Sequence, residues 1–239
     1  MFNPLAEVRD FFQAAFARTA GGDGVETADE LVRRRWVSAV AVALGTFLVN
    51  WLVRIEPGDP TFYFVSVALA LVWIAGGILS GQLRAGSSRT RSGSEDGRAV
   101  VQALVLGVLL VGLFLAGAAL IAPVPALREP VELLLDHARL SPWPLVAALA
   151  VVIGVAEELY FRGGLYAAVG GRAAVAVTAA IYAVITLPSG VPLLVFAAAV
   201  LGVVLGLQRR ATGGVLGPIV THVVWLLGMV FLLPGALER

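Results

Sequence analysis

The sequence predicts an all-α, polytopic transmembrane helix bundle with about seven spans. Of the 239 residues, 59% are hydrophobic and only 14% are charged, whereas about 25% are charged in a typical soluble domain. The mean hydropathy of +0.91 agrees. This composition excludes a soluble globular protein, a disordered chain and a basic module that binds nucleic acid. The expected partners are therefore the lipid bilayer and membrane-associated molecules.

The first 35 residues are expected to precede the bundle. Asn3 and Pro4 are typical of the start of a helix, and apolar residues then recur on one face as far as Phe16. This pattern predicts a short amphipathic helix on the membrane surface, with a solvated leader as the alternative. Further on, Thr27 and Glu30 have the spacing of a capping box and predict the start of the first long helix.

Seven apolar runs follow, each of a length that suits a membrane span. They cover residues 36–53, 61–80, 100–122, 143–161, 173–188, 191–208 and 215–234. We treat the chain as one domain with three parts. These are an N-terminal segment at 1–35, two helices and a cytoplasmic loop at 36–99, and a core at 100–234.

Two connections between the runs stand out. Residues 81–99 are rich in Gly, Ser and Arg and are expected to form a flexible loop. Residues 123–142 are a longer connection that carries Pro123, Pro125 and Pro130.

Arginine counting predicts the orientation, because all 17 basic residues are Arg and basic residues concentrate in cytoplasmic loops. With the N-terminus in the cytoplasm, 13 arginines fall on the inner side. The remaining four, Arg54, Arg128, Arg139 and Arg239, fall outside. We therefore expect a multi-pass protein of the cell membrane whose C-terminus lies outside. The abundance of Ala, Gly, Val and Arg without Lys is typical of a high-GC bacterium.

The fourth run contains two adjacent carboxylates, Glu157 and Glu158, followed by Arg162. At 1.5 Å per residue they lie about 21 Å along a span of about 30 Å, where charges are costly and suggest function. Arg162 lies one turn after Glu158 and can pair with it, whereas Glu157 points elsewhere. Two carboxylates in different environments suit general acid–base chemistry. The alternative is a Glu–Arg pair that only fixes helix packing.

Any imidazole chemistry must come from two histidines, and thiolate chemistry is excluded because the chain has no Cys. His222 falls in the last run about 10 Å from the inner face, a depth similar to that of Glu157. It is either a functional residue or a packing residue. His137 lies beside Asp136 in an outer loop, and we expect it to be solvated.

Three segments in order carry a recognisable pattern. Glu157, Glu158 and Arg162 match EExxxR, Tyr182 stands at the aromatic position of a second motif (aromatic-xxx-His), and His222 supplies the histidine of a third. In this order they resemble the CAAX protease and bacteriocin-processing (CPBP or Abi) family of intramembrane proteases, over roughly residues 100–234.

Two positions depart from the family pattern. Thr186 occupies the place of the second-motif histidine, and Leu226 occupies the place of a polar residue, usually Asn, after His222. A threonine hydroxyl can donate one hydrogen bond to an oxyanion, but it cannot replace an imidazole as a zinc ligand. Only Glu157, Glu158 and His222 then remain as metal ligands, which leaves no glutamate as a base.

The resemblance implies a cavity open to the cytoplasm in which Glu157 activates water. Glu158 and Arg162 would support it, and His222 would bind a divalent metal such as zinc or stabilise the oxyanion, with Thr186 as a weaker donor. The substrate would be a membrane-associated peptide or protein, prenylated in some family members. One alternative is a catalytically degenerate member that binds peptides or proteins, and another is a transporter or scaffold.

Overall fold

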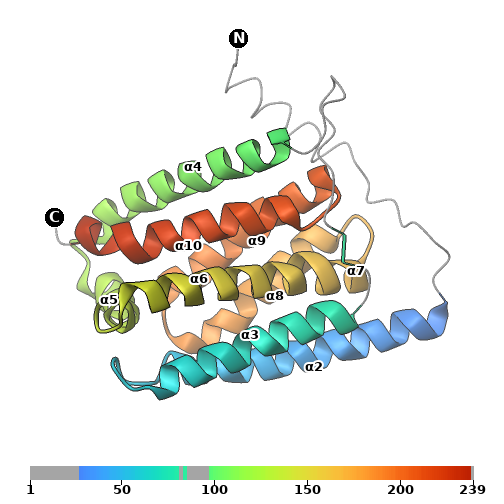
Figure 1. The fold of residues 1–239 in the computed structure, drawn as a ribbon, viewed down its shortest axis with the longest axis horizontal. Helices are drawn as coiled ribbons and strands as arrows, with labels where there is room; N and C mark the ends of the chain where they lie inside the picture. Colours follow the sequence, from blue (N-terminus) through green and yellow to red (C-terminus); the bar gives the residue numbers. More distant parts are fainter. Residues whose placement is uncertain (1–26, 81–82, 85–96, 238–239) are drawn as a thin grey trace, which may run out of the picture.

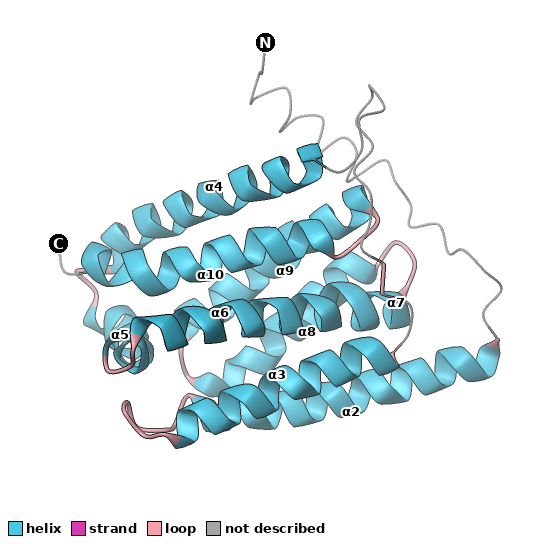
Figure 2. Ribbon diagram, in the orientation of Figure 1, coloured by secondary structure: helices cyan, strands magenta, loops and turns pink. Residues whose placement is uncertain are grey.

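The computed structural model describes residues 27–80, 83–84 and 97–237 of the chain. Figure 2 shows that this part is helical and contains no strand. Within these described residues, six helices are long and apolar enough to cross a membrane. They are α2 (Ala28–Leu52), α3 (Thr61–Leu79), α4 (Gly97–Ile121), the continuous helix Trp143–Val169, α9 (Pro192–Thr212) and α10 (Leu216–Leu237). The prediction of a polytopic all-α membrane protein is confirmed.

The helix Trp143–Val169 is the centre of the bundle. Its first part, α6 (Trp143–Glu158), lies between α3 and α10 (Figure 1) and contacts both. α4 packs on the other side of α10, and α2 packs on α3. α8 (Ala174–Thr186) and α9 pack against each other behind this layer. The central helix therefore presents its residues to helices on several sides.

The fifth predicted span is a shorter helix than the others. α8 has 13 residues and is followed by the three-residue 3₁₀ turn η2 (Leu187–Ser189). The chain reaches α8 through Gly170 and Gly171, each with φ of +64°. This conformation favours glycine, and it allows a sharp reversal directly after the central helix.

The predicted capping box at the start of α2 is confirmed. The Thr27 hydroxyl accepts a bond from the Glu30 backbone N–H at 3.3 Å, and the Glu30 carboxylate accepts from the Thr27 N–H at 3.0 Å. These bonds satisfy donors that a helix N-terminus otherwise leaves free. The predicted N-terminal amphipathic helix and most of the 81–99 loop lie outside the described residues.

The connection at 123–142 contains a helix that its prolines concealed. α5 (Pro125–Arg139) begins with a proline in its first turn, where the missing N–H costs nothing, and it tolerates Pro130 further on. It runs across one end of the bundle and is seen end-on in Figure 1. Treating this segment only as a connection was therefore wrong.

The expectation that His137 is solvated was also wrong. His137 lies on α5 with 5% of its surface exposed, and its ring stacks on Phe62 at a centroid distance of 4.2 Å. Burial lowers the pKa of His137 below its usual value near 6.5. A backbone hydrogen bond with Ile55 and the charge of Asp136 oppose this shift only in part.

Because the folded protein binds a proton at His137 less readily than the unfolded chain, lowering the pH favours unfolding. The contribution of neutral His137 is complete above about pH 6.5 and is lost as the pH falls below that value. We expect the melting temperature in detergent to fall with pH in this range. His137→Gln should flatten the fall, and an unchanged profile in this variant would contradict the assignment.

Close contact between α3 and the central helix depends on missing side chains. A Cβ on Gly77 would lie 2.7 Å from the carbonyl oxygen of Leu159, and a Cβ on Gly164 would lie 3.1 Å from the Cα of Gly77. These neighbours are backbone atoms, which cannot move aside as a side-chain end can. The two glycines therefore set the distance between the helices just beyond the two glutamates.

We expect Gly77→Ala to destabilise the protein by about 1–3 kcal/mol, because the added methyl group forces two backbones apart. Gly112→Ala on α4 is the matched control, since a Cβ there meets nothing within 4 Å. Melting temperatures in the same detergent compare the two. Equal stability of both variants would show that the helices are not held at this distance.

Candidate functional site: a buried carboxylate, arginine and histidine cluster

The helix that carries the two glutamates changes its geometry directly after them. α6 ends at Glu158, the π-helix η1 (Leu159–Leu165) follows, and α7 (Tyr166–Val169) completes the helix. Packing holds this segment, since Tyr160 stacks on Trp73 at 4.7 Å and donates a 2.7 Å hydrogen bond to the carbonyl of Ser38. π segments are rare and are frequent at functional sites. Here the segment contains Arg162.

Glu158 and Arg162 form the predicted ion pair, and both are almost completely buried. Arg162 Nη1 donates to Glu158 Oε1 at 3.0 Å, and Arg162 Nη2 donates to the carbonyl of Leu201 on α9 at 2.8 Å. Arg209 on α9 in turn donates to the carbonyl of Arg162 at 2.8 Å. The guanidinium group thus joins the central helix to α9.

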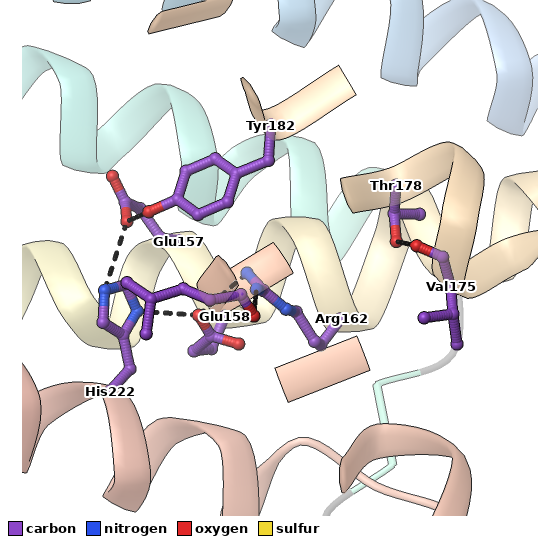
Figure 3. Close-up of polar contacts among 8 residues, drawn as sticks. Glu157, Glu158, Arg162, Val175, Thr178, Tyr182 and His222 are labelled. Atoms are coloured by element: carbon purple, nitrogen blue, oxygen red, sulfur yellow. Dashed lines mark hydrogen bonds and ion pairs between the residues drawn. The ribbon is translucent and has the colours of Figure 1, made fainter. Parts of the chain in front are cut away.

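His222 on α10 completes the cluster drawn in Figure 3. Its Nδ1 lies 2.7 Å from Glu158 Oε1, the same oxygen that accepts from Arg162. An ionised carboxylate only accepts hydrogen bonds, so His222 Nδ1 carries a proton. The Nε2 atom then faces Glu157, whose Oε2 is 3.8 Å away. Glu158 therefore fixes both the tautomer and the direction of the imidazole.

Glu157 differs from its neighbour in exposure and in partners. Its side chain is 14% exposed, whereas Glu158 is 0% exposed. Its Oε2 accepts a 2.6 Å hydrogen bond from the Tyr182 hydroxyl on α8. The structure thus brings together four predicted site residues, Glu157, Glu158, Arg162 and His222, and it leaves Glu157 as the accessible carboxylate.

Neither departure from the family pattern supplies a polar group to this cluster. The Thr186 hydroxyl donates at 2.7 Å to the carbonyl of Ala183 in its own helix, so its one proton is used there. Leu226 packs against α6, where its Cδ1 would lie 2.9 Å from a Cβ on Gly154. As placed here, Thr186 does not offer its proton to an oxyanion.

Sequence reasoning missed the role of Tyr182, which it treated only as the aromatic residue of the second motif. The contact arises because α8 starts at the Gly170–Gly171 reversal and returns beside the central helix. The signal in the sequence was the hydroxyl itself, four residues before Thr186 and so on the same helix face.

The cluster does not fit a zinc site. Among the described residues, no group of three or more His, Cys, Asp or Glu side chains is arranged to hold a metal ion. Glu158 Oε1 is already shared by Arg162 and His222, and the guanidinium charge opposes a second cation beside it.

The fold and these contacts define a multi-pass membrane protein with a buried acid and histidine cluster at the junction of four helices. Residues 139–228 match the family described as Rce1-like type II CAAX prenyl endopeptidase. This match confirms the resemblance to the CAAX protease family, and the matched segment contains every residue of the cluster. Comparisons with curated proteins and with solved structures gave no match.

We expect Glu158→Gln to destabilise the protein by about 3–5 kcal/mol, because it leaves the buried Arg162 charge without its counterion. The double variant Glu158→Gln with Arg162→Met should recover much of this loss, since no unpaired charge remains. Melting temperatures provide the measurement, with Glu129→Gln on the exposed side of α5 as a control. Additive losses in the double variant would contradict the ion pair.

Proposed function

We propose that the protein is an intramembrane endopeptidase in which Glu157 activates a water molecule to attack a peptide bond. One observation carries the proposal. Of two adjacent glutamates, one is sequestered by Arg162 and His222, and the other is partly exposed and faces the free nitrogen of the same histidine. A purely structural ion pair needs Glu158 and Arg162, but it has no use for a second carboxylate beside them.

The geometry supports a simple division of roles. Glu157 Oε2 and His222 Nε2 are 3.8 Å apart, so a water to one side of the line between them is within hydrogen-bond distance of both atoms. Glu157 takes a proton from this water while its oxygen attacks the carbonyl carbon of the substrate. When the C–N bond breaks, the protonated Glu157 returns the proton to the leaving amine. Glu158, itself held by Arg162, keeps the imidazole in the required tautomer.

We further propose that the cluster opens to the cytoplasm. It lies on the later half of the central helix, which ends at Val169 close to the start of α8. At that end of the bundle the backbone N–H of Val215 donates to the carbonyl of Arg84, and Arg172, Arg209 and Arg210 are found there as well. An arginine-rich end is the cytoplasmic end by the positive-inside rule. The N-terminus then lies inside and the C-terminus outside.

The family description and this proposed location support one class of substrate. We propose a membrane-associated peptide, prenylated or held by a hydrophobic anchor, that reaches the cluster from the cytoplasmic side. An apolar anchor remains in the lipid while the adjacent peptide bond enters the bundle.

A second candidate function is favoured by Thr186 and Leu226. The Thr186 hydroxyl donates to a carbonyl of its own helix, and the Leu226 side chain is apolar. The cluster therefore lacks two polar groups of the family pattern. A catalytically degenerate member that binds membrane peptides or proteins would keep the fold and the ion pair. Peptide or protein binding by such a member would not depend on the basicity of Glu157.

A cleavage assay in proteoliposomes separates the two candidates. The panel contains prenylated and membrane-anchored peptides, and it compares the natural protein with Glu157→Ala and Thr186→His. An active enzyme loses about 10²–10⁴-fold in rate when its general base is removed. We therefore expect cleavage by the natural protein and its loss in Glu157→Ala.

Two controls accompany the assay. Glu129→Gln changes an exposed carboxylate on α5 and should leave cleavage intact. A zinc chelator should also leave cleavage intact, because the side chains of the cluster do not fit a zinc site. Cleavage by Thr186→His alone would contradict the first candidate and favour the second. Loss of cleavage with chelator, restored by added zinc, would overturn the metal-independent mechanism.

A further inference from the structure

Tyr182 is a buried, polar residue of the cluster that the mechanism above does not use. It is 7% exposed and lies on α8, a helix that contributes no other side chain to the contacts around Glu157 in the described part of the chain. Its hydroxyl donates to Glu157 Oε2, the same oxygen that faces His222 Nε2. The tyrosine therefore touches the proposed base at the atom that would take the proton.

The direction of this hydroxyl is fixed by the packing of the ring. The Tyr182 ring lies against the Phe161 ring at a centroid distance of 4.4 Å, and the Arg162 guanidinium carbon is 5.2 Å from the Tyr182 ring centroid. A cation over an aromatic face is an attractive contact that strengthens when water is excluded. Both contacts come from the central helix, so the ring and Glu157 are positioned by the same element.

We propose that Tyr182 is the positioning residue of Glu157. Its hydroxyl holds the carboxylate in the orientation that faces His222, and its hydrogen bond favours the ionised over the protonated carboxyl group. The role of Tyr182 in catalysis rests on the proposed function, whereas its hydrogen bond to Glu157 does not depend on that proposal. The Tyr182 hydroxyl thus donates a hydrogen bond to the cluster. Thr186, one turn further along α8, does not.

Among the residues that the structure describes, four charged or titratable groups surround Glu157. Tyr182 faces it from α8, His222 from α10, and Glu158 and Arg162 lie along its own helix. A hydrogen bond to a carboxylate favours its ionised form, so removal of the Tyr182 hydroxyl should let Glu157 take up a proton at higher pH. Tyr182→Phe is a clean test, because phenylalanine keeps the ring that contacts Phe161 and Arg162.

The first readout does not require catalysis. Dicyclohexylcarbodiimide is a hydrophobic reagent that modifies protonated carboxyl groups, and mass spectrometry reports its attachment at Glu157 as a function of pH. We expect the pH of half-maximal labelling to rise by about one unit in Tyr182→Phe, as loss of a hydrogen bond to a charged group implies. Glu157→Gln identifies the labelled site, because it removes the signal.

The matched control is Tyr160→Phe. Tyr160 is also a buried tyrosine whose hydroxyl makes one short hydrogen bond, but it donates to the Ser38 carbonyl and not to a carboxylate. This variant should lower the melting temperature slightly and leave the labelling profile of Glu157 unchanged. A merely structural role of Tyr182 would make the two variants behave alike.

The second readout is cleavage, where Tyr182→Phe should lower kcat about tenfold with KM changed less than twofold. In the Glu157→Gln background the same substitution should have no further effect. A labelling profile that is identical in Tyr182→Phe and the natural protein overturns the inference. A shifted profile without cleavage by any variant supports the positioning contact and rejects the proposed peptidase function.

Discussion

Arg162 and Glu158 meet inside an apolar bundle, where a single unpaired charge would be very costly. Their 3.0 Å ion pair is possible because each has a further partner, the Leu201 carbonyl for the arginine and His222 for the glutamate. Those partners lie on α9 and α10, so the requirement to satisfy two charges fixes how both helices pack against the central one. Close packing on the opposite side is set by Gly77, where α3 meets the backbone of the π segment.

The same requirement separates two glutamates that are adjacent in the sequence. Successive residues of a helix point in directions about 100° apart, so only Glu158 reaches the arginine. Glu157 is directed towards α8 and α10 and remains partly exposed, and its polar contacts within the described residues are a hydroxyl and an imidazole. A difference in environment between neighbouring carboxylates is what acid–base chemistry needs, and here it arises from helix geometry and one buried cation.

The sequence predicted the parts of this arrangement that depend on local spacing. The apolar runs predicted the spans, the spacing of Thr27 and Glu30 predicted a capping box, and the spacing of Glu158 and Arg162 predicted the ion pair. Contacts between helices were harder to predict from the sequence, because they depend on how the helices tilt and on the chain reversal before α8. The Tyr182 hydroxyl bond to Glu157 is the clearest case.

Two errors have a common physical origin. Prolines in 123–142 concealed α5, although a proline in the first turn of a helix is well tolerated. His137 seemed solvated because Asp136 lies beside it, yet adjacent residues on a helix face different directions, and His137 turns towards Phe62. In both cases the neighbouring residues in the sequence were a poor guide to the surroundings in space.

The central claim is that Glu158 holds His222 by its Nδ1 proton and so directs Nε2 towards Glu157. Solid-state NMR on protein in lipid bilayers tests it directly, with ¹⁵N-labelled histidine and ¹³C-labelled glutamate carboxylates. His137→Gln leaves His222 as the only histidine, so its signals need no further assignment. The account predicts a protonated Nδ1 with strong dipolar coupling to a carboxylate carbon. An unprotonated Nδ1 without such coupling would contradict it.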